Sequence, residues 1–356
     1  MRKYESSILD IMDEKLKDSL LLNGISIEYQ DKLNIQWNES HRYYHDVNHL
    51  YNILNLIDND LRTTPEQKND LRTIAAYHDC VYNPREKNNE QLSADQYKAE
   101  TTSFNIDVYN AIVDTKDHTQ QPSSILSEYF LEYDLHNLLH GSLSQLIDDS
   151  NLLLKEFGFL DWSILKAGRI SFMENIAPYI KSKSTDTHID EYIEWIKLYT
   201  PKIAVFAGSF FPIHNGHINV LNKAERIFDK VIVACGQNSA KPYTLSTIEN
   251  NVFNIQKILP NNQVEFFPGF LTDYISDKPY PLTIVKGLRN PSDFDNEKLS
   301  LRWMEDLSPN IDIVYIISDR QYEHVSSSGI KMVQQIQAVT GNSNNITSKY
   351  IPNERI

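Results

Sequence analysis

The chain has 356 residues, of which 41% are hydrophobic and 23% charged, and its formal net charge is −14 at pH 7. This length and composition predict a globular protein of two domains, and the acidic balance argues against broad nucleic-acid binding, which needs a basic surface. We expect no membrane-spanning segment, no secretory signal and no disulfide between Cys80 and Cys235, which favours a reducing, cytoplasmic setting.

The first 200 residues have the apolar spacing of helices and contain no convincing strand. One helical stretch is expected over residues 1–40 and another over 151–180. His45 and His49 are spaced i, i+4 and share a helix face, and His78 and Asp79 end a further apolar helical segment. Histidines and aspartates on successive helices suit a divalent metal ion, although any single histidine of this kind is more often structural.

Four short patterns in this half follow one another in order: YHxxxH, HD, NExxSA and an acidic-x-Asp-Leu segment, between residues 44 and 135. Over residues 38–170 the chain therefore resembles the HD-domain metal-dependent phosphohydrolases. The resemblance implies an all-α domain that holds a divalent ion such as Mn, Fe, Zn or Mg, with His49, His78, Asp79 and Asp134 as its ligands. It also implies that His45 lies beside the ion and protonates a leaving group.

Three other residues are candidates for this pocket. His118 and Glu90 would complete it, and Arg169 either approaches a substrate phosphate or is a surface residue. A domain that keeps the fold and the metal only as a scaffold is the alternative. A polar stretch over residues 181–187 and a helix over 189–199 lead to a boundary near Thr200. We therefore expect a first domain at 1–185, a connection at 186–200 and a second domain at 201–356.

The second half alternates apolar strands with helices. We expect strands at 203–206, 230–234, 263–266, 282–285 and 311–316, and helices at 216–227, 247–258, 270–275, 294–306 and 327–336. Short connections between such elements predict a Rossmann-like α/β domain with a parallel sheet covered by helices on both faces.

The first of these strands leads into a turn that runs from Gly208 to His217. Small residues at a strand-to-helix turn let backbone N–H groups approach a phosphate, and a helix N-terminus adds partial positive charge. His214 and His217 are spaced i, i+3 and can face one anion, unless they are merely surface histidines. Lys286 and Arg289 flank Gly287 at the end of a later strand and also suit phosphates.

Two further stretches could either bind phosphate or have only a structural role. The hydroxyls of Ser326, Ser327 and Ser328 begin a helix, where they would either bind phosphates or only cap the helix. Lys241 follows the second strand, where it would contact an acceptor phosphate or be solvated.

Together these stretches, over residues 202–335, resemble the phosphopantetheine adenylyltransferases of the HxGH nucleotidyltransferase superfamily. The resemblance implies that ATP, with Mg²⁺, and 4′-phosphopantetheine are converted to dephospho-CoA and pyrophosphate. His214, His217 and Lys286 would be catalytic, and the substrates would be held by Gly208, Ser209, Phe210, Lys241, Gly287, Arg289, Asp293, Glu297 and Ser326–Ser328. A phosphorylated small molecule is thus the expected partner, and the family's hexamers leave a homo-oligomer open.

Several residues depart from that family's pattern. Phe211 stands where the family usually has Asp, His214 replaces a common Thr, Phe270 replaces Leu, and Lys286 replaces Arg. These departures leave nicotinamide mononucleotide open as the acceptor. A protein of another class, which binds nucleotide and metal as a sensor without turnover, is the competing hypothesis.

Overall fold

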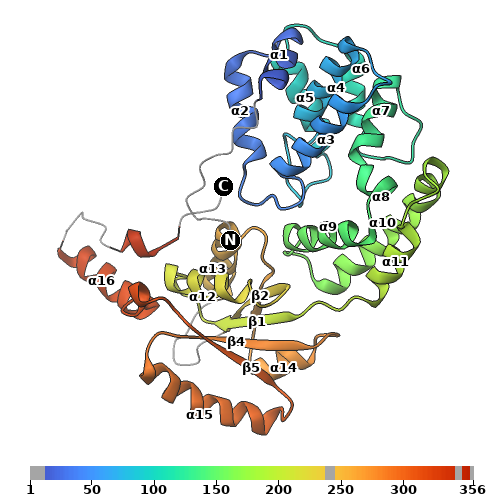
Figure 1. Cartoon of the computed structure of the whole chain (residues 1–356). Helices are drawn as coiled ribbons and strands as arrows, with labels where there is room; N and C mark the ends of the chain where they lie inside the picture. Colours follow the sequence, from blue (N-terminus) through green and yellow to red (C-terminus); the bar gives the residue numbers. More distant parts are fainter. Residues whose placement is uncertain (1–12, 237–244, 341–346, 353–356) are drawn as a thin grey trace. The chain divides into compact units, whose positions relative to one another are not determined.

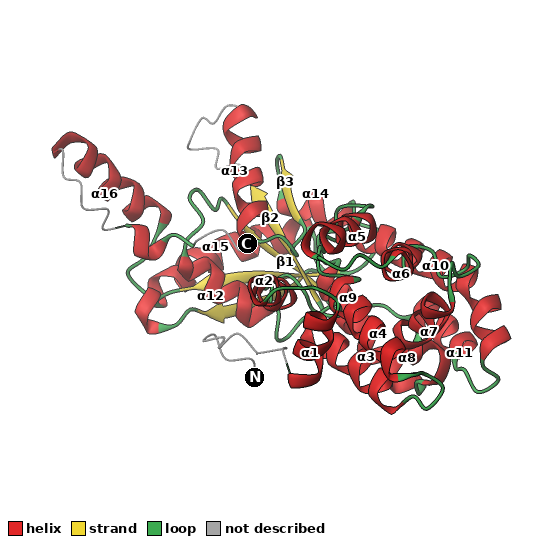
Figure 2. Cartoon of the chain, turned by 90° about the horizontal axis from the view of Figure 1, so that it is seen from above, coloured by secondary structure: helices red, strands yellow, loops and turns green. Residues whose placement is uncertain are grey.

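The computed structural model describes residues 13–236, 245–340 and 347–352, which form two compact units. Met1–Glu156 and Lys166–Leu198 make up the helical unit, and Phe157–Leu165 and Tyr199–Ile356 make up the sheet unit. Figure 1 labels their elements, and in Figure 2 the strands are confined to the sheet unit. Within the described ranges, no helix is long and apolar enough to cross a membrane.

The helical unit consists mostly of helices whose starts are fixed by polar caps. Asp13, Asp46, Asn105 and Ser124 each accept a hydrogen bond from the backbone of the first helical turn, and Thr64 forms a capping box. The helices are α1 (Glu14–Leu22), α2 (Ile27–Trp37), α3 (Val47–Asn59), α4 (Pro65–Tyr77), α5 (Asn89–Glu100), α6 (Ile106–Asp114), α7 (Ile125–Asp134), α8 (His136–His140), α9 (Leu143–Glu156), α10 (Trp162–Lys183) and α11 (Ile189–Leu198).

The first core cluster of this unit draws on α1 to α7, and α3, α4 and α7 meet within it. Leu50, Ile53 and Ile57 recur along one face of α3 and are buried, as are Ile74 on α4 and Phe130 on α7. This apolar packing orients the ends of the three helices, which carry the polar residues described below.

The structure corrects two expected helices. Within the expected helix 1–40, α1 and α2 are separated at Gly24, which has a φ of 74° that a residue with a side chain rarely adopts. The expected helix 151–180 is also interrupted, between the end of α9 and the start of α10. The connection and the first turn of α10, together Phe157–Leu165, pack within the sheet unit, where Lys230 donates hydrogen bonds to the carbonyls of Gly158 and Leu160.

The sheet unit has the expected alternation and a five-stranded sheet in which all neighbours are parallel. Its strands are β1 (Ile203–Gly208), β2 (Lys230–Gly236), β3 (Val264–Phe267), β4 (Leu282–Leu288) and β5 (Asp312–Ile317). Its helices are α12 (Asn215–Ala224), α13 (Leu245–Ile258), α14 (Leu271–Ser276), α15 (Pro291–Leu307) and α16 (Ser327–Thr340), with short 3₁₀ helices at Arg320–Tyr322 and Ser348–Tyr350.

The strand order β3-β2-β1-β4-β5 decides where this unit can bind a ligand. The chain builds outward from β1 through β2 to β3, and then returns to place β4 on the other side of β1. Residue Ile203 is accordingly in register with Lys230 on one side and Leu282 on the other. A parallel sheet binds ligands where its order reverses, at the carboxyl ends of the strands, so β1 and β4 frame the expected site.

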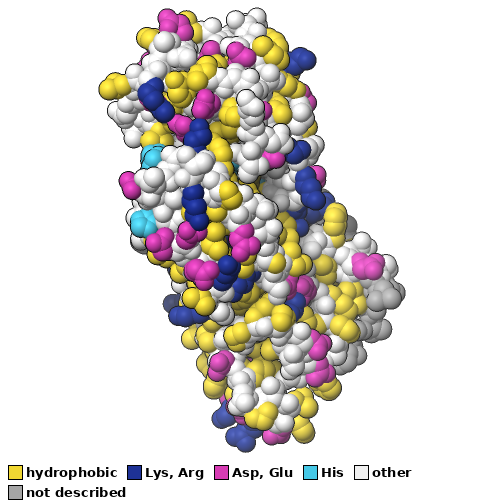
Figure 3. Space-filling model, turned by 90° about the vertical axis from the view of Figure 1, so that its right-hand side faces the viewer, with side chains coloured by type: hydrophobic (Ala, Val, Ile, Leu, Met, Phe, Trp, Pro, Cys, Tyr) yellow, Lys and Arg dark blue, Asp and Glu magenta, His cyan; other side chains and the backbone are white. Residues whose placement is uncertain are grey.

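Charged side chains are interspersed on the face of the molecule that Figure 3 shows. Lysine and arginine alternate there with aspartate and glutamate, and no extended basic area forms on that face.

Candidate functional site

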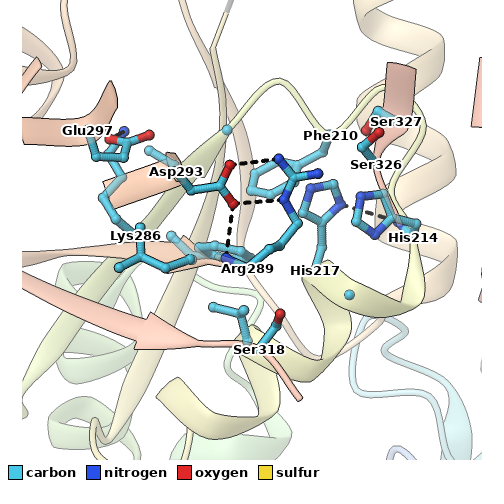
Figure 4. Close-up of a pocket in the computed structure, with 17 residues that line it drawn as sticks. Phe210, His214, His217, Lys286, Arg289, Asp293, Glu297, Ser318, Ser326 and Ser327 are labelled. Carbon is cyan, nitrogen blue, oxygen red and sulfur yellow. Dashed lines mark hydrogen bonds and ion pairs between the residues drawn. The ribbon is translucent and has the colours of Figure 1, made fainter. Parts of the chain in front are cut away.

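A cavity of about 350 Å³ opens at the carboxyl ends of β1 and β4. The end of β1, the first turn of α12, the end of β4 and the turn before α16 line it together (Figure 4). The cavity walls include most of the residues predicted for this half of the chain: Gly208, Phe210, His214, His217, Lys286, Gly287, Arg289, Asp293, Glu297, Ser326 and Ser327.

Two histidines face each other at the start of α12. The rings of His214 and His217 are stacked with centroids 3.6 Å apart, and the backbone N–H of His214 donates to Nδ1 of His217 at 3.3 Å. A neutral His217 must therefore carry its proton on Nε2. Burial, the neighbouring His214 and the positive charge of Arg289 hold the pKa of His217 well below its usual range.

His214 itself is 3% exposed, and its pKa is lowered to about 4 by burial and by Arg289. Its Nδ1 is buried and finds no hydrogen-bond partner in the described part of the chain. A Cβ on Gly216 would lie 3.0 Å from this Nδ1, so glycine at 216 allows the ring to pack against the helix start. Both imidazoles are thus neutral donors or acceptors beside a polar cavity.

The cations of the cavity are held by acidic partners. Asp293 accepts two hydrogen bonds from the guanidinium of Arg289, both at 2.9 Å, and one from the Arg289 backbone N–H at 3.0 Å (Figure 4). Lys286 lies 3.4 Å from the carboxylate of Glu297. The Arg289 hydrogen bonds lower the pKa of Asp293, so this pair is charged at neutral pH.

The three serines near the start of α16 differ in their contacts and in whether they line the cavity. Ser326 accepts a hydrogen bond from the backbone N–H of Gly329 at 3.0 Å and so caps the helix, as the structural alternative predicted, while it also lines the cavity. Ser327 lines the cavity and donates to the carbonyl of Pro212. Ser328 is exposed and is not among the residues that form the cavity wall.

Ser209 faces a second, smaller hollow together with Phe211 and Asn251. Lys241 lies outside the described residues. The sequence analysis missed one polar side chain of the cavity: Ser318 directly follows β5, and its buried Oγ has no hydrogen-bond partner within the described ranges. Its place at the carboxyl edge of the predicted sheet was the only signal that the sequence offered.

Comparisons with known proteins agree with this geometry. The cytidylyltransferase-like family model matches residues 205–333. The phosphopantetheine adenylyltransferase of Syntrophomonas wolfei is 40% identical over 133 residues, which cover 36% of this chain and 81% of that protein. The enzyme of the same name from Geobacter sulfurreducens is 38% identical over 138 residues, which cover 38% of this chain and 83% of that protein. The chain belongs to the phosphopantetheine adenylyltransferase family through its sheet unit.

A solved structure is also similar in part. It is the crystal structure of a bifunctional NMN adenylyltransferase/ADP ribose pyrophosphatase from Francisella tularensis, complexed with AMP and a Mn ion. Its identity is 16% and its TM-score 0.29, with 43% of this chain and 44% of that chain covered. These values are too low to support a shared fold or substrate. The adenylyltransferase assignment therefore rests on the sequence relatives and on the cavity between β1 and β4.

The helical unit contains a second cluster of polar residues, whose positions in the sequence precede the residues that the family model matches. One ligand atom each from His49, His78 and Asp79 lie within 4.8 Å of one another. Asp134, the last residue of α7, lies 3.1 Å from Nε2 of His49 and 3.9 Å from Nε2 of His78. The structure thus brings together all four predicted metal ligands, and His118 lies 2.9 Å from the other oxygen of Asp134.

The tautomer of His78 suits a metal ligand. Its Nδ1 donates to the carbonyl of Ala75 at 2.9 Å, so in the neutral imidazole, the form that binds a metal ion, the lone pair is on Nε2. This residue is 1% exposed, and its Nε2 lies 3.3 Å from Oδ2 of Asp79 and makes no hydrogen bond within the described residues. A buried imidazole nitrogen beside the carboxylates of Asp79 and Asp134 is the arrangement that a divalent ion would complete.

His45 is held by a residue that the sequence did not reveal. Its Nδ1 lies 2.6 Å from the carboxylate of Glu156, whose side chain is 0% exposed. The same carboxylate accepts the hydroxyl of Tyr82 and the backbone N–H groups of residues 43, 44 and 45. Because Glu156 is 111 positions away at the end of α9, no local spacing indicated it.

Glu90 and Arg169, the remaining candidates of the helical unit, are not part of the cluster of possible metal ligands. Glu90 has a buried oxygen, and Arg169 a buried Nε, for which the described ranges provide no hydrogen-bond partner. Arg169 also donates to the hydroxyl of Tyr192. The structure places neither residue among the three groups that could share one ion.

Proposed function

We propose that the sheet unit transfers an adenylyl group from ATP to 4′-phosphopantetheine and releases pyrophosphate. The observation that carries this proposal is the hydrogen bond that Nδ1 of His217 accepts from the backbone N–H of His214. Because Nδ1 of the neutral His217 is occupied in this way, its Nε2–H is the group available to an oxygen of the α-phosphate. A donor that is oriented before the reaction stabilises charge that develops there without reorganising.

The reaction needs positioning and charge stabilisation and no covalent intermediate. A phosphate oxygen of the acceptor attacks the α-phosphorus, and the bond from that phosphorus to the bridging oxygen of pyrophosphate breaks in line. Lys286 and Arg289 place positive charge beside the triphosphate, and their carboxylate partners fix where those charges lie.

Magnesium fits this site as part of the nucleotide complex. The acidic side chains in the cavity wall, Asp293 and Glu297, are already paired with Arg289 and Lys286. Phosphate oxygens of ATP would therefore be the ion's main ligands, and the ion would neutralise the leaving pyrophosphate.

The decisive experiment measures pyrophosphate release from ATP and Mg²⁺ by the full-length protein. 4′-Phosphopantetheine and nicotinamide mononucleotide are supplied separately, and the product is identified by its mass. Release only with 4′-phosphopantetheine supports the proposal. Release only with the mononucleotide assigns the same chemistry to another acceptor, whereas ATP binding without release favours a sensor.

We also propose that the helical unit is a metal-dependent phosphohydrolase. The buried Nε2 of His78 beside His49, Asp79 and Asp134 supports it, since these groups would hold a divalent ion. Such an ion lowers the pKa of bound water and polarises a phosphoryl oxygen. His45, charged beside Glu156, would hold the proton that the leaving group needs. Phosphate release from model phosphoesters, with and without added Mn²⁺, tests this second activity.

A further inference from the structure

The loop of residues 209–212, between β1 and α12, has an unusual backbone. Phe210 has a φ of 43°, in the left-handed region that a residue with a bulky side chain rarely occupies. Such a conformation persists only where the surroundings hold it. Phe210 is buried, with its ring centroid 4.9 Å from that of Phe206 and 5.0 Å from that of His217. The shape of this loop is thus coupled to the catalytic histidine.

Contacts from two helices hold the loop. Asn251 on α13 donates to the carbonyl of Ser209 at 3.4 Å. Ser327 on α16 donates to the carbonyl of Pro212 at 2.8 Å. The ammonium of Lys331, one turn further along α16, lies 3.8 Å from the ring centroid of Phe211. Residues 327 and 331 are spaced i, i+4 and so lie on the same face of the helix.

We propose that Ser327 and Lys331 form one clamp that positions the loop, with the ring of Phe211 as the anchor for Lys331. An ammonium over an aromatic face is attracted by the ring quadrupole, so this contact does not need an acidic residue at 211. An aspartate at this position would pair with the same lysine but would place a negative charge in the loop. With Phe211, the loop keeps its anchor and presents no carboxylate to an anionic acceptor.

The clamp has a defined consequence for the reaction, if the proposed adenylyl transfer is accepted. The loop carries Ser209, which faces the smaller hollow, and Phe210, which packs against His217. Arg289 and its partner Asp293 lie on the other wall of the main cavity, after β4. Loosening the clamp therefore weakens acceptor binding and turnover more than it weakens ATP binding.

The variant Lys331→Met tests the clamp in the full-length protein. We expect about a tenfold rise in the KM for 4′-phosphopantetheine, with the KM for ATP and the Tm unchanged. Lys331→Arg, which keeps a cation over the ring, restores the KM. The matched control is Lys257→Met, because Lys257 lies 4.9 Å from the ring centroid of Phe253 on α13, outside the loop. This control should leave both KM values at the wild-type level.

A double-mutant cycle identifies the anchor. If Lys331 acts through Phe211, the variant Phe211→Leu with Lys331→Met is no worse than either single variant. Additive effects in the cycle would overturn the assignment of Phe211 as the anchor.

Hydrogen exchange of the backbone amides of residues 209–211 and 213 separates this proposal from the proposed function. A wild-type protein that turns over no acceptor would overturn the function, while the exchange measurement would still report on the clamp. Faster exchange in Lys331→Met than in Lys257→Met supports the clamp. Equal exchange in these two variants would refute it.

Discussion

Glu156 and His45 lie 2.6 Å apart in the helical unit, carboxylate to Nδ1, although 111 positions separate them in the chain. Burial by itself lowers the pKa of His45, but the charge of Glu156 and its hydrogen bond outweigh this effect and raise the pKa to about 9. His45 is therefore a cation at neutral pH, fixed by one of the most deeply buried carboxylates of the unit.

Replacing Glu156 with Gln should destabilise the helical unit while leaving the metal ligands in place. The change leaves His45, whose side chain is 23% exposed, without the counter-charge of a fully buried carboxylate, and breaking such a pair typically costs about 3 kcal/mol. Urea unfolding measures the loss. The control is Glu174→Gln, since Glu174 forms an exposed ion pair with Lys197 at 3.1 Å and should change stability by less than about 1 kcal/mol. Equal effects of the two changes would mean that the buried pair has no special role.

Removing two proposed ligands should abolish metal binding. In His78→Ala combined with Asp79→Ala, we expect the affinity for Mn²⁺ to fall at least about 100-fold, because two of the clustered ligand atoms are lost. Metal content by mass spectrometry and titration calorimetry measure the change. His140→Ala is the matched control, since His140 packs against His136 in α8 and lies outside the cluster. Unchanged metal content in the double variant would show that the assigned ligands are wrong.

His217→Ala should separate turnover from nucleotide binding. The loss of an oriented donor at the α-phosphate lowers kcat by about 100- to 1000-fold. ATP affinity should change little, because Lys286 and Arg289 remain. Pyrophosphate release and equilibrium ATP binding are the two measurements. His324→Ala is the control, as His324 contacts the hydroxyl of Tyr350 outside the cavity. A kcat that stays within threefold of wild type would remove His217 from the catalytic role.

Asp293→Asn should weaken ATP binding through Arg289. The amide keeps the size of the carboxylate but has only one acceptor oxygen, so the two-point hold on the guanidinium is lost. We expect the KM for ATP to rise about tenfold with the acceptor KM unchanged. Asp319→Asn, which breaks an exposed ion pair with Lys223, is the matched control. If both variants bind ATP as the wild type does, Arg289 needs no positioning by Asp293.

Lys230 should make the stability of the sheet unit depend on pH. Burial lowers its pKa to about 7, although Asp161 and Glu265 oppose the shift, whereas an unfolded lysine has a pKa of about 10.4. Between these values the unfolded chain binds a proton that the folded chain has released, so the free energy of unfolding rises with pH.

The size of this effect follows from the same two values. From pH 7 to pH 10 the stability of the wild type should rise by about 3 kcal/mol relative to Lys230→Met. Urea unfolding at several pH values measures the difference, and subtraction of the variant removes the titration of the tyrosines. Parallel curves for the two proteins would show that Lys230 keeps its proton when folded.

The sequence determined the alternation of strands and helices in the second half and the helical character of the first. Both follow from local apolar periodicity, which each element carries in its own residues. It also identified the two histidines of the cavity, Lys286, Arg289, and the serines at the start of α16, because their patterns at strand ends and helix starts are local. It placed His49, the adjacent pair His78 and Asp79, and Asp134 on three successive helical segments, without showing that they meet.

Only the tertiary structure decided the partners of these residues. Glu156 reaches His45, Ser318 enters the cavity, and Lys331 covers Phe211 because the chain folds back over long separations. The segment Phe157–Leu165, which local periodicity assigns to a continuous helix, instead packs within the sheet unit. Burial, pKa shifts and the choice of hydrogen-bond partner depend on which distant groups exclude water from a side chain. Local spacing along the chain does not contain that information.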